Sequence, residues 1–183
     1  MCKEARANPS LGRPVDKTPV DHFGTRDDRS AGKPKRSLVT QVPRKPGSYA
    51  LFFLLDKRVH LEVGKLGRFL LEPGVLVYFG SAMGPGGLGA RIARHLSPGK
   101  KRRWHVDYLQ PHARPIVIWF STGGEGQECN WSKTMASQEG SYFPIRGFGS
   151  SDCSCPSHLL HLDKVPLPKV LGDPKRPLET VII

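Results

Sequence analysis

The hydrophobic residues of this chain gather first in a run without polar interruption. Ala50–Leu55 reads ALFFLL, which is too apolar for a strand with one face in water and predicts a central strand of a sheet. After a turn at Asp56–Lys57, the segment Arg58–Val63 alternates polar and apolar residues, which is the period of a half-buried strand. The two segments together predict a β-hairpin.

A second apolar run leads into a glycine-rich loop and then a helix. Val75–Phe79 is rich in β-branched and aromatic residues and predicts a buried strand. The loop at residues 84–89 contains four glycines, whose backbones can adopt conformations closed to other residues. From Leu88 onward, apolar residues recur at i, i+4 and i+8, which predicts a helix with one packed face. Three basic residues fall elsewhere on this helix: Arg91, Arg94 and His95.

Two more segments complete the expected fold. Ile116–Phe120 has the composition of a strand, and Glu128–Gln138 can form a helix of modest intrinsic propensity. The connecting segment Gly64–Pro73 contains a short strand candidate at Arg68–Leu71. We therefore predict an α/β fold of the α+β kind, with a small mixed or antiparallel sheet flanked by helices.

The distribution of proline and charge divides the chain into three parts. Residues 1–45 combine repeated proline with many basic residues and lack apolar periodicity, so they cannot bury enough surface to offset the entropy of ordering. We expect them to form a disordered basic leader. Residues 46–163 are the expected folded domain, and residues 164–183 are expected to form a proline-rich C-terminal tail.

The charge of the chain indicates its class of partner. With 183 residues and a formal net charge of +12, the protein is strongly basic, which most often indicates nucleic-acid binding. A solvated basic protein with a cationic tail is the alternative. The first ten residues lack the apolar core that a signal peptide needs, and the sequence contains no apolar stretch of about 18 residues, so we expect a cytoplasmic protein without a membrane partner. Nothing in the pattern indicates an oligomeric state.

The glycine-rich loop at residues 84–89 also raises the question of a nucleotide site. It lacks the G-K-[S/T] ending of a P-loop, and it lacks the G-x-G-x-x-G register with a later acidic residue. We therefore expect no nucleotide cofactor.

Two tripeptides, Gly47-Ser48-Tyr49 and Tyr78-Phe79-Gly80, stand at the ends of strands that we expect to be neighbours. With the helix carrying Arg91, they resemble the GIY-YIG nuclease superfamily, in particular its Uri-type branch of small, mostly uncharacterised prokaryotic proteins. The resemblance covers residues 46–162. Ser48 and Phe79 replace the middle isoleucines of the two tripeptides. The wide gap between the tripeptides departs from the superfamily, but it is typical of the Uri-type branch, as is the GPGGL loop.

This resemblance implies a metal-dependent endonuclease that hydrolyses phosphodiester bonds of DNA, with RNA as a second candidate substrate. Arg91 would stabilise the charge that develops on the phosphate, and Glu128 would hold one Mg²⁺ or Mn²⁺. Tyr49 and Tyr78 would orient or deprotonate the attacking water, with Tyr78 as the first choice, and His95 would assist as an acid–base group or a phosphate contact. A module of the same fold that binds nucleic acid without cleaving it is the first alternative, and a zinc-stabilised interaction domain is the second.

A basic run after the helix extends the expected nucleic-acid surface. The residues expected to contact phosphate are Arg94, Lys100, Lys101, Arg102 and Arg103. Three residues that follow, His105, Asp107 and His112, either line the cleft or cap and pack, and we favour the second role.

Cysteine and histidine cluster near the end of the expected domain. Cys153, Cys155 and His158 form a C-x-C-x-x-H pattern that offers three ligands to zinc, and a structural Zn²⁺ is therefore a candidate cofactor. Buried thiols in a tight loop are the alternative. Cys129 is a candidate for the missing fourth ligand, although a helix turns about 100° per residue and Cys129 should then point away from Glu128.

Overall fold

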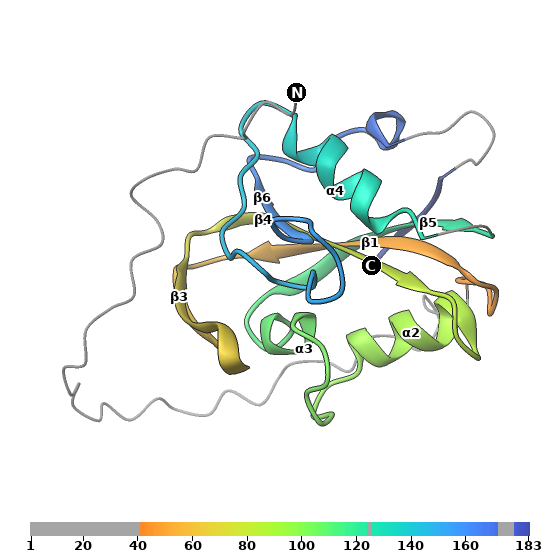
Figure 1. Cartoon of the computed structure of the whole chain (residues 1–183), viewed down its shortest axis with the longest axis horizontal. Helices are drawn as coiled ribbons and strands as arrows, with labels where there is room; N and C mark the ends of the chain where they lie inside the picture. Colours follow the sequence, from red (N-terminus) through yellow and green to blue (C-terminus); the bar gives the residue numbers. More distant parts are fainter. Residues whose placement is uncertain (1–40, 124–125, 172–177) are drawn as a thin grey trace.

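The computed structural model describes residues 41–123, 126–171 and 178–183. Its centre is a five-stranded antiparallel sheet with the strand order β6-β4-β1-β5-β7 (Figure 1). These strands are β1 (Gly47–Leu55), β4 (Gly74–Ala82), β5 (Arg114–Thr122), β6 (Leu159–Leu162) and β7 (Glu179–Ile182). The expected α+β architecture is confirmed.

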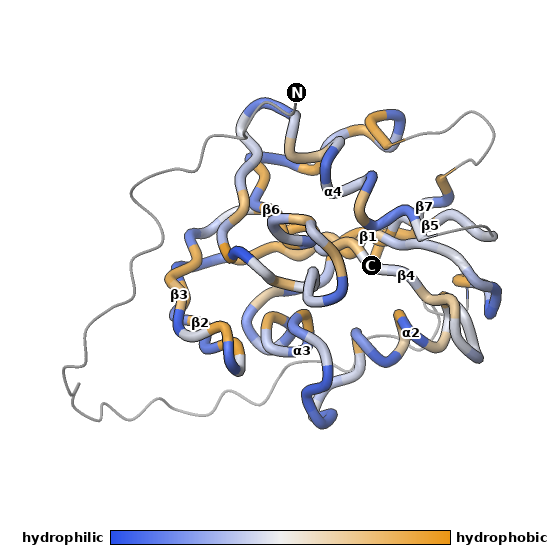
Figure 2. The backbone as a smooth tube through the Cα atoms, in the orientation of Figure 1, coloured by the Kyte–Doolittle hydropathy of each residue, from blue (hydrophilic) through white to orange (hydrophobic). Residues whose placement is uncertain are grey.

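Strand β1 is central because both of its edges are paired, with β4 on one side and β5 on the other. Its side chains alternate between two hydrophobic clusters, so that Leu51 and Phe53 face one side of the sheet while Ala50 and Phe52 face the other. All four are buried. This double burial explains the uninterrupted apolar run, since neither face of β1 contacts water. Hydrophobic segments accordingly run through the middle of the molecule, with hydrophilic turns outside (Figure 2).

The helices cover both faces of the sheet. Helix α4 lies on one face, and helices α2 and α3 lie on the other (Figure 1). Their bounds are Gly87–Leu96 for α2, Val106–Leu109 for α3 and Glu128–Ala136 for α4. Leu88, Ile92 and Leu96 of α2 are buried, as the i, i+4, i+8 spacing predicted. Trp131 and Met135 of α4 pack into the opposite cluster.

The predicted hairpin between Ala50–Leu55 and Arg58–Val63 is wrong. Strand β2 (Val59–Val63) pairs instead with β3 (Gly67–Leu71), across a short 3-10 turn, η1 (Gly64–Leu66), and forms a separate two-stranded sheet. The reason is that β4 and β5 already occupy both edges of β1. The short strand expected at Arg68–Leu71 is present and supplies the partner of β2.

Both ends of the described chain extend beyond the expected domain. Residues 41–45 were expected within the leader, yet Val42 is buried and the carbonyl of Lys45 accepts a hydrogen bond from the N–H of Leu88. The rest of the expected leader, residues 1–40, lies outside the described residues. The segment 164–183, expected to be a tail, contains the 3-10 turn η2 (Pro168–Val170) as well as β7, which adds the fifth strand to the sheet. In the part of the chain that the structure describes, no helix is both long and apolar enough to cross a membrane.

Candidate active site

A cavity of about 240 Å³ opens where β1, β4, α2 and α4 meet. Four of the five residues expected to be catalytic line it together: Tyr49, Tyr78, Arg91 and Glu128. Nine more residues complete its walls: Gly80, Ser81, Arg103, Trp104, His105, Gly149, Ser151, Asp152 and His158. The cavity is therefore built from segments that lie far apart in the sequence.

The two tyrosines come from neighbouring strands of the sheet. Tyr49 lies opposite Gly80 in the β1–β4 ladder, and the rings of Tyr49 and Tyr78 are 6.4 Å apart between centroids. A Cβ atom at Gly80 would lie 2.5 Å from Cζ of Tyr49, so only glycine leaves room for the phenol. Gly149 approaches the Tyr78 ring in the same way, because a Cβ atom added at Gly149 would lie 2.7 Å from Cε2 of that ring. Burial raises the pKa of both phenols above the ordinary value, with the charge of Arg91 partly opposing it.

His95 does not line the cavity, in contrast to its expected contact with phosphate. It is buried behind Tyr49, and the Tyr49 hydroxyl lies 2.8 Å from His95 Nε2. His95 Nδ1 in turn lies 3.3 Å from Asp107 Oδ1. Burial lowers the pKa of His95, although Asp107 opposes this shift. A neutral imidazole therefore donates from Nδ1 to Asp107 and accepts a hydrogen bond from the Tyr49 hydroxyl at Nε2.

Asp107 anchors this chain of hydrogen bonds. Its Oδ2 accepts from the backbone N–H groups of Arg103 (2.9 Å) and Trp104 (3.1 Å), which places Asp107 in a capping role. Burial alone would raise the pKa of this carboxyl, but the hydrogen bonds from His95, Arg103 and Trp104 outweigh it and hold the pKa well below the ordinary value. Of the two roles considered for Asp107, the structure shows the capping one.

Lys100 was expected to contact nucleic acid, but it points into the protein. Its ammonium group donates to the backbone carbonyls of Arg94 and His95 at the end of α2 and forms an ion pair of 3.1 Å with Asp107. Its side chain is only 10% exposed. Lys100 therefore stabilises the C-terminus of α2 and is not part of an open basic surface.

The remaining basic residues are arranged around two aromatic rings. The guanidinium groups of Arg91, Arg94 and Arg103 lie 4.4, 4.8 and 4.9 Å from the centroid of Trp104. Arg102 lies 4.8 Å from the centroid of Tyr108, away from the cavity, and Lys101 is exposed. Cation–π contacts of this kind hold flexible arginines in fixed positions.

A second cavity of about 220 Å³ adjoins the first. The two share three lining residues, Arg91, Arg103 and Trp104, and the second adds Arg94 and the glycine-rich loop. The first cavity mixes two arginines with the carboxylates of Glu128 and Asp152, whereas the ionisable groups lining the second are all arginines. The second cavity is therefore the more favourable place for an anion.

Glu128 is the first residue of α4 and faces the cavity. Its Oε1 accepts a hydrogen bond of 3.1 Å from the Ser81 hydroxyl on β4, whereas its Oε2 is buried and has no hydrogen-bond partner among the described residues. Ser48 fixes the start of α4, because its Oγ accepts from the backbone N–H of Gln127 at 2.7 Å. Ser48, which replaces the isoleucine of the first tripeptide, therefore ties β1 to the helix that carries Glu128.

Three polar residues of the cavity were not predicted as site residues: Ser81, Ser151 and Asp152. Ser81 directly follows the second tripeptide, and Asp152 directly precedes Cys153, so adjacency to a motif was the available signal. His105 lines the cavity, and its Nδ1 accepts from the backbone N–H of Gly149 at 2.8 Å. The lining role of His105, which we considered but did not favour, is therefore the one observed.

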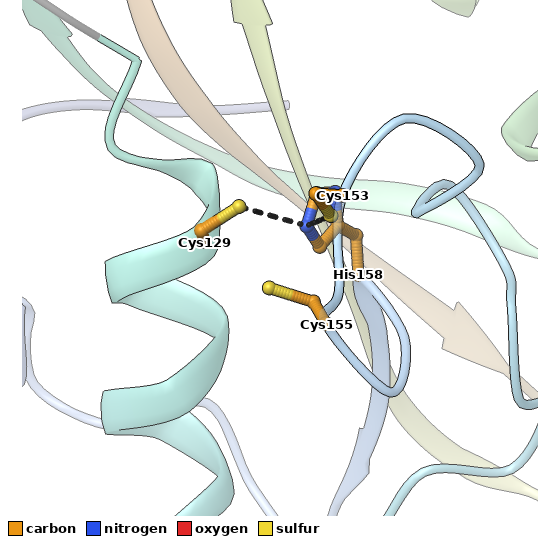
Figure 3. A group of neighbouring side chains, drawn as sticks. All are labelled: Cys129, Cys153, Cys155 and His158. Carbon is orange, nitrogen blue, oxygen red and sulfur yellow. Dashed lines mark hydrogen bonds between the residues drawn. The ribbon is translucent and has the colours of Figure 1, made fainter.

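The cysteine–histidine cluster has four members. Cys129, Cys153, Cys155 and His158 place their ligand atoms within 4.8 Å of one another, an arrangement that could hold a metal ion. Cys129 projects from α4 toward the three residues of the loop (Figure 3). The expected direction of Cys129 away from Glu128 does not exclude it, because the loop passes along that side of the helix. Burial and the neighbouring thiols raise the pKa of Cys129 to about 12.

Comparison with known proteins places the chain in a family. A family model described as a domain of unknown function, DUF123, matches residues 48–172, about two thirds of the chain. The protein therefore belongs to the DUF123 family. No curated protein matches the chain, and no solved structure matches it.

Proposed function

We propose that the protein is a metal-dependent endonuclease of the GIY-YIG kind that hydrolyses phosphodiester bonds of DNA. The observation that carries this proposal is the convergence of Tyr49, Tyr78, Arg91 and Glu128, from four different elements, on one cavity. Such a set provides a hydroxyl pair for a water molecule, a cation for phosphate and a carboxylate for a metal. We further propose a cytoplasmic location, where reducing conditions keep the cysteines as thiols.

The residues present fit one Mg²⁺ or Mn²⁺ at Glu128. These hard cations take oxygen ligands and keep several waters, so a single carboxylate with space beside it is sufficient. Glu128 Oε2 is buried and lacks a partner among the described residues, which is costly unless a cation or water compensates it. When bound, the ion would supply charge stabilisation for the scissile phosphate and the leaving oxygen.

Arg91 would bind the scissile phosphate. Its guanidinium is held against Trp104 and borders both cavities. A fixed guanidinium offers two donors in the plane of a phosphate, and it needs little rearrangement as negative charge grows in the transition state.

The tyrosines would position the attacking water. Their raised pKa values keep both phenols protonated near neutral pH. The Tyr49 hydroxyl donates its proton to His95 Nε2, and its oxygen has two lone pairs, one for the hydrogen bond from the Arg91 side chain and one that can accept from water. Proton transfer from that water to Tyr49 would then be balanced by transfer of the Tyr49 proton to His95, whose imidazolium Asp107 would stabilise. Tyr78 would orient the same water from the neighbouring strand.

The second cavity extends the proposed substrate path. Its three arginines would hold the phosphate next to the scissile one on the same strand, since Arg91 and Arg103 border both cavities. Lys101 and Arg102 are exposed and would add sequence-independent attraction to the backbone. These contacts read phosphates and not bases, so they apply to DNA and RNA alike.

A module of this fold that binds nucleic acid without cleaving it is the second candidate. The observation that favours it is the raised pKa of both phenols, which leaves neither tyrosine ionised as a base near neutral pH. The metal ion proposed below for the cysteine–histidine cluster would be compatible with either function.

The deciding experiment incubates the pure protein with supercoiled plasmid, branched DNA and single-stranded RNA, each with Mg²⁺, Mn²⁺ or EDTA. The nuclease proposal expects products only with a divalent metal. The binding-module alternative expects retarded complexes on a native gel in all conditions and no products. Absence of metal-dependent products from every substrate overturns the nuclease proposal.

A further inference from the structure

The cysteine–histidine cluster joins two walls of the cavity. Cys129 lies on α4 immediately after Glu128, and Cys153, Cys155 and His158 lie on the loop that contributes Asp152 and His158 to the lining of the same cavity. We propose that these four residues bind one structural Zn²⁺, and that this ion fixes the Glu128 end of α4 relative to the Asp152 loop.

Two distances within the cluster match those of a tetrahedral zinc site. With Zn–S bonds of about 2.3 Å and Zn–N bonds of about 2.0–2.1 Å, a sulfur ligand and a nitrogen ligand are about 3.5–3.6 Å apart. The Sγ atoms of Cys129 and Cys153 lie 3.6 and 3.5 Å from His158 Nε2. The side chains converge from two separate segments on one point (Figure 3). All four ligand atoms lie within 4.8 Å of one another.

The donor set selects the metal and its role. Three sulfurs and one imidazole are soft or borderline ligands, which suit Zn²⁺ and not the Mg²⁺ expected at Glu128. Four protein ligands also leave no open position for water or substrate, which is typical of a structural zinc and not of a catalytic one. The two proposed metal sites therefore differ in chemistry and in role.

A metal ion in the cluster would affect the cavity because the cluster and the cavity share a residue. His158 both belongs to the cluster and lines the cavity, and its backbone carbonyl accepts from the N–H of Phe79 on β4. A further contact joins this loop to α4, because the Ser132 hydroxyl on α4 donates to the carbonyl of Ser157 at 2.7 Å. Zinc would add coordinate bonds to this link. Zinc binding stands without the proposed nuclease activity, whereas its effect on cleavage rests on that activity.

The first test measures metal content. Protein purified without added metal should contain about one zinc per chain by elemental mass spectrometry. Replacement by Co²⁺ should give visible absorption bands of a tetrahedral site with thiolate ligands. Cys155→Ser should weaken zinc binding by more than the roughly 10–100-fold that loss of an outer-shell contact costs. Cys2→Ser is the matched control, because Cys2 is not one of the four proposed ligands, and it should retain the zinc of the parent.

The second measurement keeps the proposal testable if Cys155→Ser fails to fold. Hydrogen exchange of the parent before and after zinc removal by a chelator should show increased exchange in residues 126–132 and 149–158, and little change in β1. A parent chain that carries no zinc and gives no tetrahedral Co²⁺ spectrum overturns zinc binding. Unchanged exchange in both segments after zinc removal overturns the clamp. If the purified protein contains zinc but cleaves no substrate, the nuclease proposal alone is refuted. If the purified protein cleaves DNA but contains no zinc, the zinc proposal alone is refuted.

Discussion

Tyr49 lies directly opposite Gly80 across the β1–β4 ladder, and its phenol occupies the space that a side chain at position 80 would need. The tyrosine that ends one tripeptide and the glycine that ends the other therefore form one packing unit. This unit directs the Tyr49 hydroxyl to His95 and brings its ring to the cavity. The pairing gives a physical reason for both residue types at these two positions.

Gly80→Ala should disrupt this unit. The added Cβ would collide with Tyr49, and overpacking of this kind typically costs about 1–3 kcal/mol of stability. We expect a lower melting temperature and loss of cleavage, measured by thermal unfolding and by a plasmid assay. Gly84→Ala is the matched control for stability, because a Cβ atom at that position would meet no atom within 4 Å, and it should melt at the parental temperature. Equal effects of both substitutions would contradict the packing argument.

Arg91→Ala should reduce cleavage far more than it reduces stability. Removal of one preorganised electrostatic group typically costs about 10²–10³ in turnover, and Arg91 is held in place mainly by Trp104. The measurement compares single-turnover cleavage with the melting temperature. Arg102→Ala removes an arginine that stacks on Tyr108 outside the cavity, so at saturating DNA it should retain turnover although its DNA affinity falls. A variant at position 91 that cleaves at the parental rate would exclude Arg91 from the chemistry.

Substitutions of Lys100 and Lys101 should have different effects on stability and on DNA binding, although the two residues are neighbours in the sequence. Lys101 is exposed, so Lys101→Ala should lower the slope of log affinity against log salt by about 0.9 if it contacts one phosphate of duplex DNA. Lys100 donates to two carbonyls of α2 and pairs with Asp107, so Lys100→Met should destabilise the protein by about 1–3 kcal/mol. It should leave the salt slope unchanged. Binding titrations at several salt concentrations and denaturant unfolding separate these effects, and an altered slope for Lys100→Met would show that Lys100 reaches the nucleic acid.

Stability should fall on mild acidification partly through His95. Burial lowers the pKa of His95 in the folded protein, so the unfolded chain binds the proton more tightly. The contribution of neutral His95 is therefore fully present above about pH 6.5, the ordinary pKa, and is lost as the pH falls below it.

The difference in unfolding free energy between the parent and His95→Gln isolates this residue from the other histidines. We expect the difference to be largest near pH 8 and to shrink toward pH 5, as measured by denaturant unfolding. A difference that does not depend on pH would mean that the pKa of His95 is the same in the folded and the unfolded protein.

The sequence predicted those parts of the fold that depend on local pattern. The uninterrupted run Ala50–Leu55 identified the central strand because burial on both faces excludes polar residues, and the spacing from Leu88 identified the packed face of α2. The two tripeptides, at the ends of strands expected to be neighbours, predicted that Tyr49 and Tyr78 lie together. Each of these predictions rests on patterns that can be recognised within individual segments of the sequence.

The remaining features depend on pairing between distant segments. The alternation of polar and apolar residues in Arg58–Val63 predicted a half-buried strand but not its partner. A repeat of two residues does not show which other strand has an edge free for pairing. Lys100 has the composition of a surface cation, and only the fold shows that Asp107 draws it inward. Cys129 likewise becomes part of the cluster through the path of a loop some 25 residues later, which helical geometry alone does not reveal.

The most direct test of the proposed nuclease is cleavage by Glu128→Gln beside the parent, with Mg²⁺, Mn²⁺ or EDTA. The substitution keeps the size of the side chain and its contact with Ser81 while removing the charge expected to hold the metal. We predict metal-dependent cleavage by the parent, a loss of about 10² or more in the variant, and unchanged or tighter DNA binding in EDTA. Parental cleavage that persists in EDTA, or a variant that cleaves as fast as the parent, would contradict the account.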